Sequence, residues 1–290
     1  VESWLPSVRE VVVAGDDDQS VHEWAGAVPH GLSRFESKHG STRVNLKRSY
    51  RLPETLRLHA VCFVRNNVFD RVDKHFEPVS EGGTLNHHGN LGSVRAPKPD
   101  EDTLVLFRNH SLRQEVEDWL QGHNVPYLTD SGKPGPLQNW VAAAVKAWLK
   151  LQSDHKHLGA GALNDREWRT LLQKATPGTK NRLNRGELDR VVEEPWNKAL
   201  VVPRALTRYY VALERRYGTP VPDSKVRLST VHGSKGQEAH RVVLLNSASE
   251  TTAASASKNP QAEARVWYVG LTRAQAELDV VSGDNGYRGV

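Results

Sequence analysis

The first residues suited to chemistry follow an apolar run near the start of the chain. Residues 11–13 are all Val, and Gly15, the three carboxylates of residues 16–18 and Gln19 come shortly after. A β-branched run that ends in Gly and carboxylates predicts a buried parallel strand whose carboxyl end opens into a polar loop. Open α/β sheets bind ligands at such ends, which places Gln19 at the mouth of a ligand crevice. A solvated turn is the alternative interpretation of this stretch taken alone.

A second stretch carries three polar side chains of different chemistry. Its pattern is Thr-x-His-x-x-Lys-Gly-x-Glu, in which His232, Lys235 and Glu238 supply a donor, a cation and an acceptor. Gly233 and Gly236 have no side chain, so a ligand can approach the backbone closely. This segment is therefore a second candidate for ligand binding.

Two further stretches complete an ordered set of four. Residues 46–51 read Leu-Lys-Arg-Ser-Tyr-Arg, and residues 267–274 read Trp-Tyr-Val-Gly-Leu-Thr-Arg-Ala. Together with residues 11–20 and 227–238, and in chain order, they resemble motifs III, IV, V and VI of the UvrD/Rep-type superfamily 1 DNA helicases. Four ordered motifs are far more specific than any one of them. The close match is confined to the motif segments, and it is this resemblance that indicates the function.

The resemblance implies that three residues act on the γ-phosphate of ATP. Gln19 senses this phosphate, and Arg51 and Arg273 reach it across a domain cleft as arginine fingers. Charge develops on the γ-phosphate oxygens during phosphoryl transfer, and electrostatic stabilisation is the main contribution of the protein. A guanidinium stays charged and offers two donors at once, which Lys cannot imitate.

The resemblance also implies nucleotide contacts by Tyr50, which stacks on the adenine, by Glu238, which contacts the ribose, and by Gly236. The phosphate-binding pattern Gly-x-x-x-x-Gly-Lys-Ser/Thr does not occur in the chain, and neither does an Asp-Glu-x-Gln-Asp box. We expect both upstream of Val1. ATP and Mg²⁺ are thus the expected cofactors of the full-length protein, with most Mg²⁺ ligands upstream, and the isolated chain is expected to be inactive.

DNA contacts follow from the same resemblance. Non-specific binding of single strands uses aromatic platforms beside a basic track, and His22 and Trp24 lie directly after Gln19. His22 stands where the family usually has Tyr, and Ala25 where Arg is common, so weaker stacking is expected. A core or interface tryptophan is the alternative for Trp24. The residues implied in contacts to the DNA backbone are Thr230, His232 and Lys235.

Apolar strands alternate with amphipathic helices, which predicts an α/β fold with a RecA-like parallel sheet. The expected strands are residues 10–14, 42–46, 103–107, 125–128, 226–230, 241–245 and 278–282. The expected helices are residues 19–26, 53–68, 112–121, 137–149, 196–217 and 261–274. Residues 80–100 are expected to form a loop or an edge hairpin, and residues 247–259 a mobile loop. No metal site is predicted, because the adjacent His87 and His88 point apart in a strand.

The middle of the chain predicts an inserted helical domain at residues 134–222. From residue 134 to residue 220 the chain has 15 Lys and Arg against 8 Asp and Glu, a net +7, whereas the whole chain carries +5. This excess favours contact with a phosphate backbone, with a solvated basic surface as the alternative. The expected domains are residues 1–35, the end of a first RecA-like motor domain, residues 36–133 and 223–290, a second one, and residues 134–222, a 2B-like insertion.

Composition sets the outer bounds. The chain has 290 residues, of which 38% are hydrophobic and 25% charged, which is typical of a globular protein of one to three domains. It contains no apolar run of about 18 residues that could cross a membrane. The lone Cys62 excludes an internal disulfide framework and favours a reducing cytoplasm. Because Cys62 lies in an apolar run, we expect it to be a buried structural thiol.

These observations predict the C-terminal part of an ATP-dependent DNA helicase. It would couple ATP hydrolysis to translocation on single-stranded DNA and to unwinding at duplex junctions, with 3′ to 5′ as the expected direction. One alternative is the motor part of a helicase-nuclease, which a nuclease domain beyond Val290 would identify. Another is a non-enzymatic DNA-binding module derived from a helicase, which a phosphate-binding loop upstream would reject.

Overall fold

The structure is a computed structural model, and it describes residues 2–132, 135, 145, 148–150, 152–153, 194–200, 202–218, 221 and 223–290. The helix predicted at residues 137–149 falls largely outside the described residues, as does most of the predicted basic insertion, and so does the side chain of Trp24. The chain divides into two compact units. The first unit comprises Val1–Val94, Asp102–Arg113 and Ser229–Val290, and the second comprises Arg95–Glu101 and Gln114–Leu228. The domain boundaries proposed from the sequence stay a prediction.

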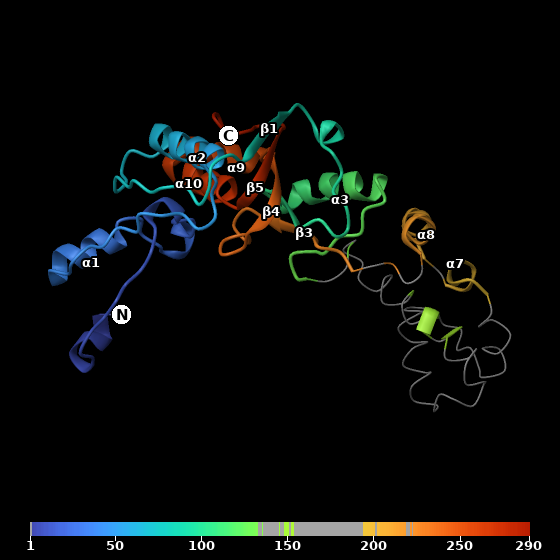
Figure 1. The fold of residues 1–290 in the computed structure, drawn as a ribbon, viewed down its shortest axis with the longest axis horizontal. Coiled ribbons are helices and arrows are strands. Elements are labelled where there is room, and N and C mark those ends of the chain that lie inside the picture. The colour runs from blue at the N-terminus through green and yellow to red at the C-terminus, as the bar shows by residue number, and fades with distance from the viewer. Residues whose placement is uncertain are drawn as a thin grey trace. The chain divides into compact units, whose positions relative to one another are not determined.

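The described strands form a parallel sheet (Figure 1). Its strands are β1 Thr84–His88, β2 Thr103–Phe107, β3 Val226–Thr230, β4 Ala239–Asn246 and β5 Ala274–Ser282, in the order β1-β5-β4-β2-β3. Leu278 in β5 lies opposite Leu85 in β1 and Val242 in β4. Every residue of β2 is buried, as expected for a parallel sheet that is covered on both faces. The predicted α/β class with a RecA-like parallel sheet is confirmed.

Helices α2 Glu54–Asn67 and α10 Pro260–Leu271 of the first unit pack against this sheet, and α9 Glu250–Lys258 packs against α10. Helix α1 Gly31–His39 has no buried residue and lies away from the sheet (Figure 1). The start of α10 is set by Pro260 in the first turn and by the side chain of Asn259, which accepts a hydrogen bond from the backbone N–H of Ala262. The core between α2, α10 and the sheet contains Leu56, Phe63, Trp267, Leu104, Leu244 and Leu278. Helix α10 is thereby fixed against β4 and β5, and Arg273 follows directly at its end.

The second unit contains most of α3 Arg113–Gly122 together with α7 Trp196–Ala199 and α8 Arg204–Tyr217. The single helix predicted at residues 196–217 is two helices, because the residue before α8 is Pro203, whose backbone is not helical and which has no N–H to donate within a helix. The Tyr209 hydroxyl donates to the Val125 carbonyl at 2.7 Å and ties α8 to the segment after α3. None of the described helices is long and apolar enough to cross a membrane.

Two predicted strands near the N-terminus are wrong. Residues 10–14 and 42–46 have no regular structure, and Val12 and Leu46 are 86% and 87% exposed. A strand needs neighbours that satisfy its backbone groups, and within the described residues no strand pairs with either segment. The helix predicted at residues 19–26 is also wrong, since only the short 3-10 turns Asp17–Gln19 and Glu23–Ala25 form there.

Four further predictions need correction. The supposed loop or hairpin at residues 80–100 contains β1, an edge strand that pairs in parallel with β5. The supposed mobile loop at residues 247–259 contains α9, which the Ser249 side chain caps by accepting from the N–H of Thr252. Residues 125–128 form only an isolated bridge, between Leu128 and Arg227. Cys62 is exposed rather than buried, because it lies on the outer side of α2.

Candidate functional site

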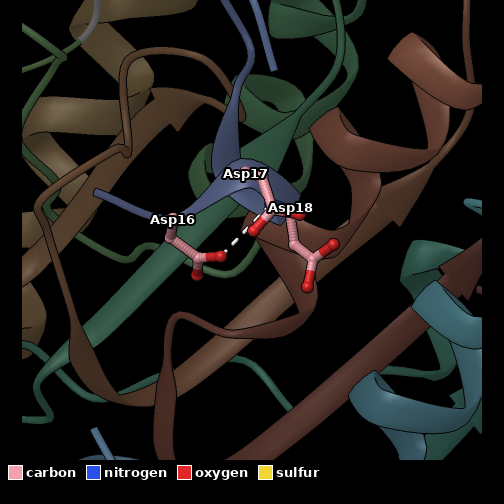
Figure 2. A group of neighbouring side chains, drawn as sticks. All are labelled: Asp16, Asp17 and Asp18. Carbon is pink, nitrogen blue, oxygen red and sulfur yellow. Dashed lines mark hydrogen bonds between the residues drawn. The ribbon is translucent and has the colours of Figure 1, made fainter. Parts of the chain in front are cut away.

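The segment that carries Gln19 folds into a short acidic turn. Asp16 caps the 3-10 helix Asp17–Gln19 by accepting a hydrogen bond from the backbone N–H of Asp18 at 3.1 Å. Figure 2 shows the three neighbouring carboxylates of this turn, which can bring oxygen atoms within 4.8 Å of one another. Carboxylates this close repel each other, so the turn requires compensating cations.

Two basic side chains supply this compensation. Arg71 donates two hydrogen bonds to Asp18, at 2.9 and 2.7 Å. The Lys74 ammonium contacts Asp16 and Asp17 and lies 2.8 Å from Asp18. Burial alone would raise the pKa of Asp17, but hydrogen bonds from Lys74 and from the backbone outweigh it and hold that pKa below its usual value. An ammonium group therefore fills the space among the three carboxylates.

Gln19, the last residue of the turn, uses both ends of its side-chain amide. Its Nε2 donates to Asp16 Oδ2 at 2.7 Å, and its Oε1 accepts from Arg273 Nη2 at 3.1 Å. The backbone carbonyl of Gln19 accepts from Lys235 Nζ at 3.0 Å. Three candidate residues that lie far apart in the sequence, Gln19, Lys235 and Arg273, thus meet at one place.

Arg273 lies between α10 and β5, and only 1% of it is exposed. Its Nε donates to the Val269 carbonyl at 2.8 Å, its Nη1 to the Gln237 carbonyl at 3.2 Å and its Nη2 to Thr272 Oγ1 at 2.9 Å. Burial, and after it the positive charge of Arg51, lowers the pKa of Arg273 to about 10, so the guanidinium stays charged at pH 7. Within the described residues its hydrogen-bond partners are neutral oxygen atoms, so the charge remains able to attract an anion.

Arg51 and Glu238 extend the same cluster toward solvent. Arg51 Nε donates to Glu238 Oε2 at 2.6 Å, and Arg51 Nη1 donates to the Thr272 carbonyl at 3.2 Å. Gln275 donates to the other carboxylate oxygen of Glu238 at 2.9 Å. The hydrogen bond from Arg51 holds the pKa of Glu238 below its usual value. The side chains of Arg51 and Glu238 are 28% and 44% exposed, so a polar ligand can reach both.

The remaining nucleotide candidates, Tyr50 and Gly236, are exposed, and they lie close in sequence to Arg51 and Glu238. The Tyr50 residue is 84% exposed, and its ring centroid lies 5.8 Å from the guanidinium carbon of Arg48. One face of an exposed ring can take a stacked base. Gly236 has a φ of +86°, a conformation that favours glycine, and this explains the residue type at that position of the loop.

A second cluster surrounds His232. Arg108 donates to both carboxylate oxygens of Glu263 at 2.8 Å, and its Nη1 lies 3.4 Å from His232 Nδ1. The ring centroids of His22 and His232 are 6.3 Å apart. Burial, followed by the Arg108 charge, lowers the pKa of His232 to about 4. His232 is therefore a neutral ring at pH 7 and can contact a ligand by hydrogen bonding, not by charge.

The structure brings together only some of the DNA candidates. His22 and His232 are neighbours, whereas the Thr230 hydroxyl accepts from the backbone N–H of Gly233 at 3.0 Å and stabilises the turn locally. Lys235 contacts Gln19, as described above. The backbone of Trp24 belongs to the 3-10 turn Glu23–Ala25, but its side chain lies outside the described part of the chain.

Several charged residues of these clusters were missed by the sequence reasoning. The sequence indicates such residues only in α10, where Glu263 and Arg265 interrupt an otherwise apolar, fully buried stretch of the helix. Arg265 donates to the Asp17 carbonyl at 3.0 Å and to Asp70 at 2.6 Å, so it also holds the acidic turn. The missed residues are Arg71, Lys74, Arg108, Glu263 and Arg265.

Comparison with known proteins gives two matches. Residues 208–283 match the family model described as UvrD-like helicase C-terminal domain. A DNA helicase II of Haemophilus influenzae is 26% identical over 138 residues, which cover 42% of this chain and 19% of that protein. The chain thus aligns with about one fifth of the length of this relative.

Proposed function

Because the chain belongs to the UvrD/Rep-type superfamily 1 DNA helicases and represents a C-terminal portion of one, we propose that it works within an ATP-dependent motor. The intact protein would move along single-stranded DNA, 3′ to 5′, and unwind duplexes, and it would reside in the cytoplasm. Since the chain aligns with only 19% of its relative, this activity concerns the intact protein. The isolated chain would not hydrolyse ATP.

The observation that carries this proposal is the continuous cluster of Gln19, Arg273, Arg51 and Glu238. Gln19 is hydrogen-bonded to Arg273 and Glu238 to Arg51, and Thr272 links the two pairs by accepting from both guanidinium groups. Two cations and an amide suit the oxygens of a triphosphate, on which negative charge increases during phosphoryl transfer. The exposed carboxylate of Glu238 suits a ribose hydroxyl, and the exposed Tyr50 ring suits the adenine.

The described residues fit the nucleotide but not its Mg²⁺ ion. The acidic turn at Asp16, Asp17 and Asp18 is the described carboxylate group closest to a metal-binding arrangement, yet Lys74 and Arg71 already compensate its charge. We therefore propose that the Mg²⁺ ligands lie mostly upstream of this chain. When bound, the ion would neutralise charge on the phosphate oxygens.

On the DNA side, Lys235 connects the two proposed activities. Its ammonium donates a hydrogen bond to the Gln19 carbonyl, and the Gln19 side chain in turn accepts a hydrogen bond from Arg273. We propose that Lys235, with His22, Trp24, Thr230 and His232, contacts single-stranded DNA. The net positive charge of residues 134–220 supports a further contact with the phosphate backbone. The basic candidates of that contact, Lys180, Arg182, Arg185 and Arg190, lie outside the described residues.

The proposal is tested by ATP hydrolysis in the intact protein, with and without single-stranded DNA. Wild type should be a DNA-stimulated ATPase. Arg273→Ala and Arg273→Lys should both lower kcat by roughly 10³-fold, with a modest change in nucleotide affinity, as is typical of arginine fingers.

Arg65→Lys is the matched control, because Arg65 pairs with the exposed Asp73 away from the cluster. Near-normal turnover of Arg273→Lys would reduce Arg273 to a structural residue. An intact protein that binds DNA but lacks any phosphate-binding loop and any ATPase activity would favour the non-enzymatic DNA-binding module.

A further inference from the structure

The Gln19 side chain separates Asp16 from Arg273 and bonds to both. Its donor end is bonded to Asp16 Oδ2 at 2.7 Å, and its acceptor end to Arg273 Nη2 at 3.1 Å. Arg273 is only 1% exposed in this arrangement. One N–H of Gln19 Nε2 is therefore taken by Asp16, and a phosphate oxygen can use this N–H only by replacing the carboxylate. A phosphate oxygen that approaches Arg273 Nη2 must replace its bond to Gln19 or its bond to Thr272 Oγ1.

Two groups besides Gln19 hold Asp16 in place. Its Oδ1 accepts from the backbone N–H of Asp18 at 3.1 Å, and the Lys74 ammonium contacts the same carboxylate. Lys74 is fixed in turn by Asp17 and by Asp18, which lies 2.8 Å away. The carboxylate facing Gln19 thus has little freedom to move. Hydrogen bonds to a charged acceptor are roughly twice as strong as neutral ones, so this acceptor competes well for Nε2.

We propose that Asp16 is a positioning residue that competes with the γ-phosphate for the side-chain amide of Gln19, and that Lys74 anchors it for this task. The inference rests on the proposed function, because it deepens the role of Gln19 in nucleotide binding. The competition concerns only the third phosphate. It follows that weakening the Asp16 bond strengthens the binding of a nucleoside triphosphate and leaves that of a diphosphate unchanged.

The test uses the intact protein with Asp16→Asn and Asp16→Ser, and measures binding of ADP and of a non-hydrolysable ATP analogue. Asn and Ser retain the ability to cap the 3-10 helix, but neither offers a charged acceptor to Gln19. For both variants the Kd of the analogue should fall about threefold to tenfold, the range that one hydrogen bond corresponds to. The Kd of ADP should stay within about twofold of wild type. In steady state, KM for ATP should fall by a similar factor as the analogue Kd while kcat changes little.

Asp70→Asn is the matched control, because it removes a carboxylate from Arg265 near the same turn without touching Gln19. It should alter neither Kd. Unchanged binding of the analogue in both Asp16 variants would overturn the inference, and so would a parallel loss of ADP and analogue binding with a lower Tm. If Arg273→Ala still abolished hydrolysis in those cases, the proposed function would stand. A wild-type protein that neither binds nor hydrolyses ATP would overturn both.

Discussion

Replacing His232 by Gln should remove a pH-dependent part of the stability. The pKa of His232 is lowered to about 4, chiefly by burial, from 6.5. Below pH 6.5 the unfolded chain therefore takes up a proton that the folded protein does not, and the free energy of unfolding falls until the pH reaches about 4. The fall is at most about 1.4 kcal/mol per pH unit, or about 2 kcal/mol between pH 6.5 and 5. Because the ring is partly exposed, we expect about half of this.

The measurement is urea unfolding of the intact protein at pH 7.5, 6.5, 5.5 and 5, followed by intrinsic tryptophan fluorescence, to which the buried Trp267 of the first unit contributes. Wild type should lose about 1 kcal/mol more than His232→Gln over this interval. The interval stays above pH 5 because Asp17 and Asp279, whose pKa values are lowered, lose their contribution only at more acidic pH. His240→Gln, at an exposed position of β4, should follow the wild-type curve. Parallel curves for wild type and His232→Gln would refute the reasoning.

Two further predictions follow from the same geometry. In DNA-binding titrations at pH 7.5, Lys235→Gln should reduce the slope of log Kd against log salt concentration by about one unit. His232→Gln should weaken binding without changing that slope, because only a cation releases counterions. Equal slopes in wild type and Lys235→Gln would place Lys235 away from the phosphates. Cys62 is exposed on α2, so its thiol should react with a thiol reagent in the native protein at a rate close to that in urea. Cys62→Ser should leave Tm unchanged. A thiol that reacts much more slowly in the native protein than in urea would contradict its exposure.

The sheet and its main helices were predictable because their signals are local. Apolar runs at residues 103–107 and 226–230 form strands at those residues, and α2 begins immediately after Pro53. The ordered motifs also indicated residues that the fold brings together. Gln19, Arg51, Glu238 and Arg273 are separated by up to 254 positions in the chain, yet they form one hydrogen-bonded cluster. Spacing alone contains no information on such a contact, and the resemblance to a known family supplied it.

The failures have a common physical cause. A run such as residues 11–13 has a strong preference for β structure, but a strand is stabilised only by neighbours, and the described chain provides none at that place. Cys62 lies in an apolar run, but helix α2 buries only one side, which contains Leu56, Phe63 and Val64. Lys74 and Arg108 could not be identified as partners of carboxylates, because the residue type alone does not show whether a basic side chain is solvated or paired with a buried acid.

The charges of the first unit serve two different purposes. In the acidic turn each carboxylate has a cationic partner, and Asp18 and Arg71 are buried together with bidentate geometry. Removing one partner of such a pair costs about 3–5 kcal/mol, so paired charges fix the geometry of the turn. Arg273 is buried as deeply, but its hydrogen bonds within the described residues go to neutral oxygen atoms. A cation held in this way keeps its attraction for an anion without any need to reorganise. The paired charges therefore hold Gln19 in position, and the unpaired charge of Arg273 supplies the attraction for phosphate.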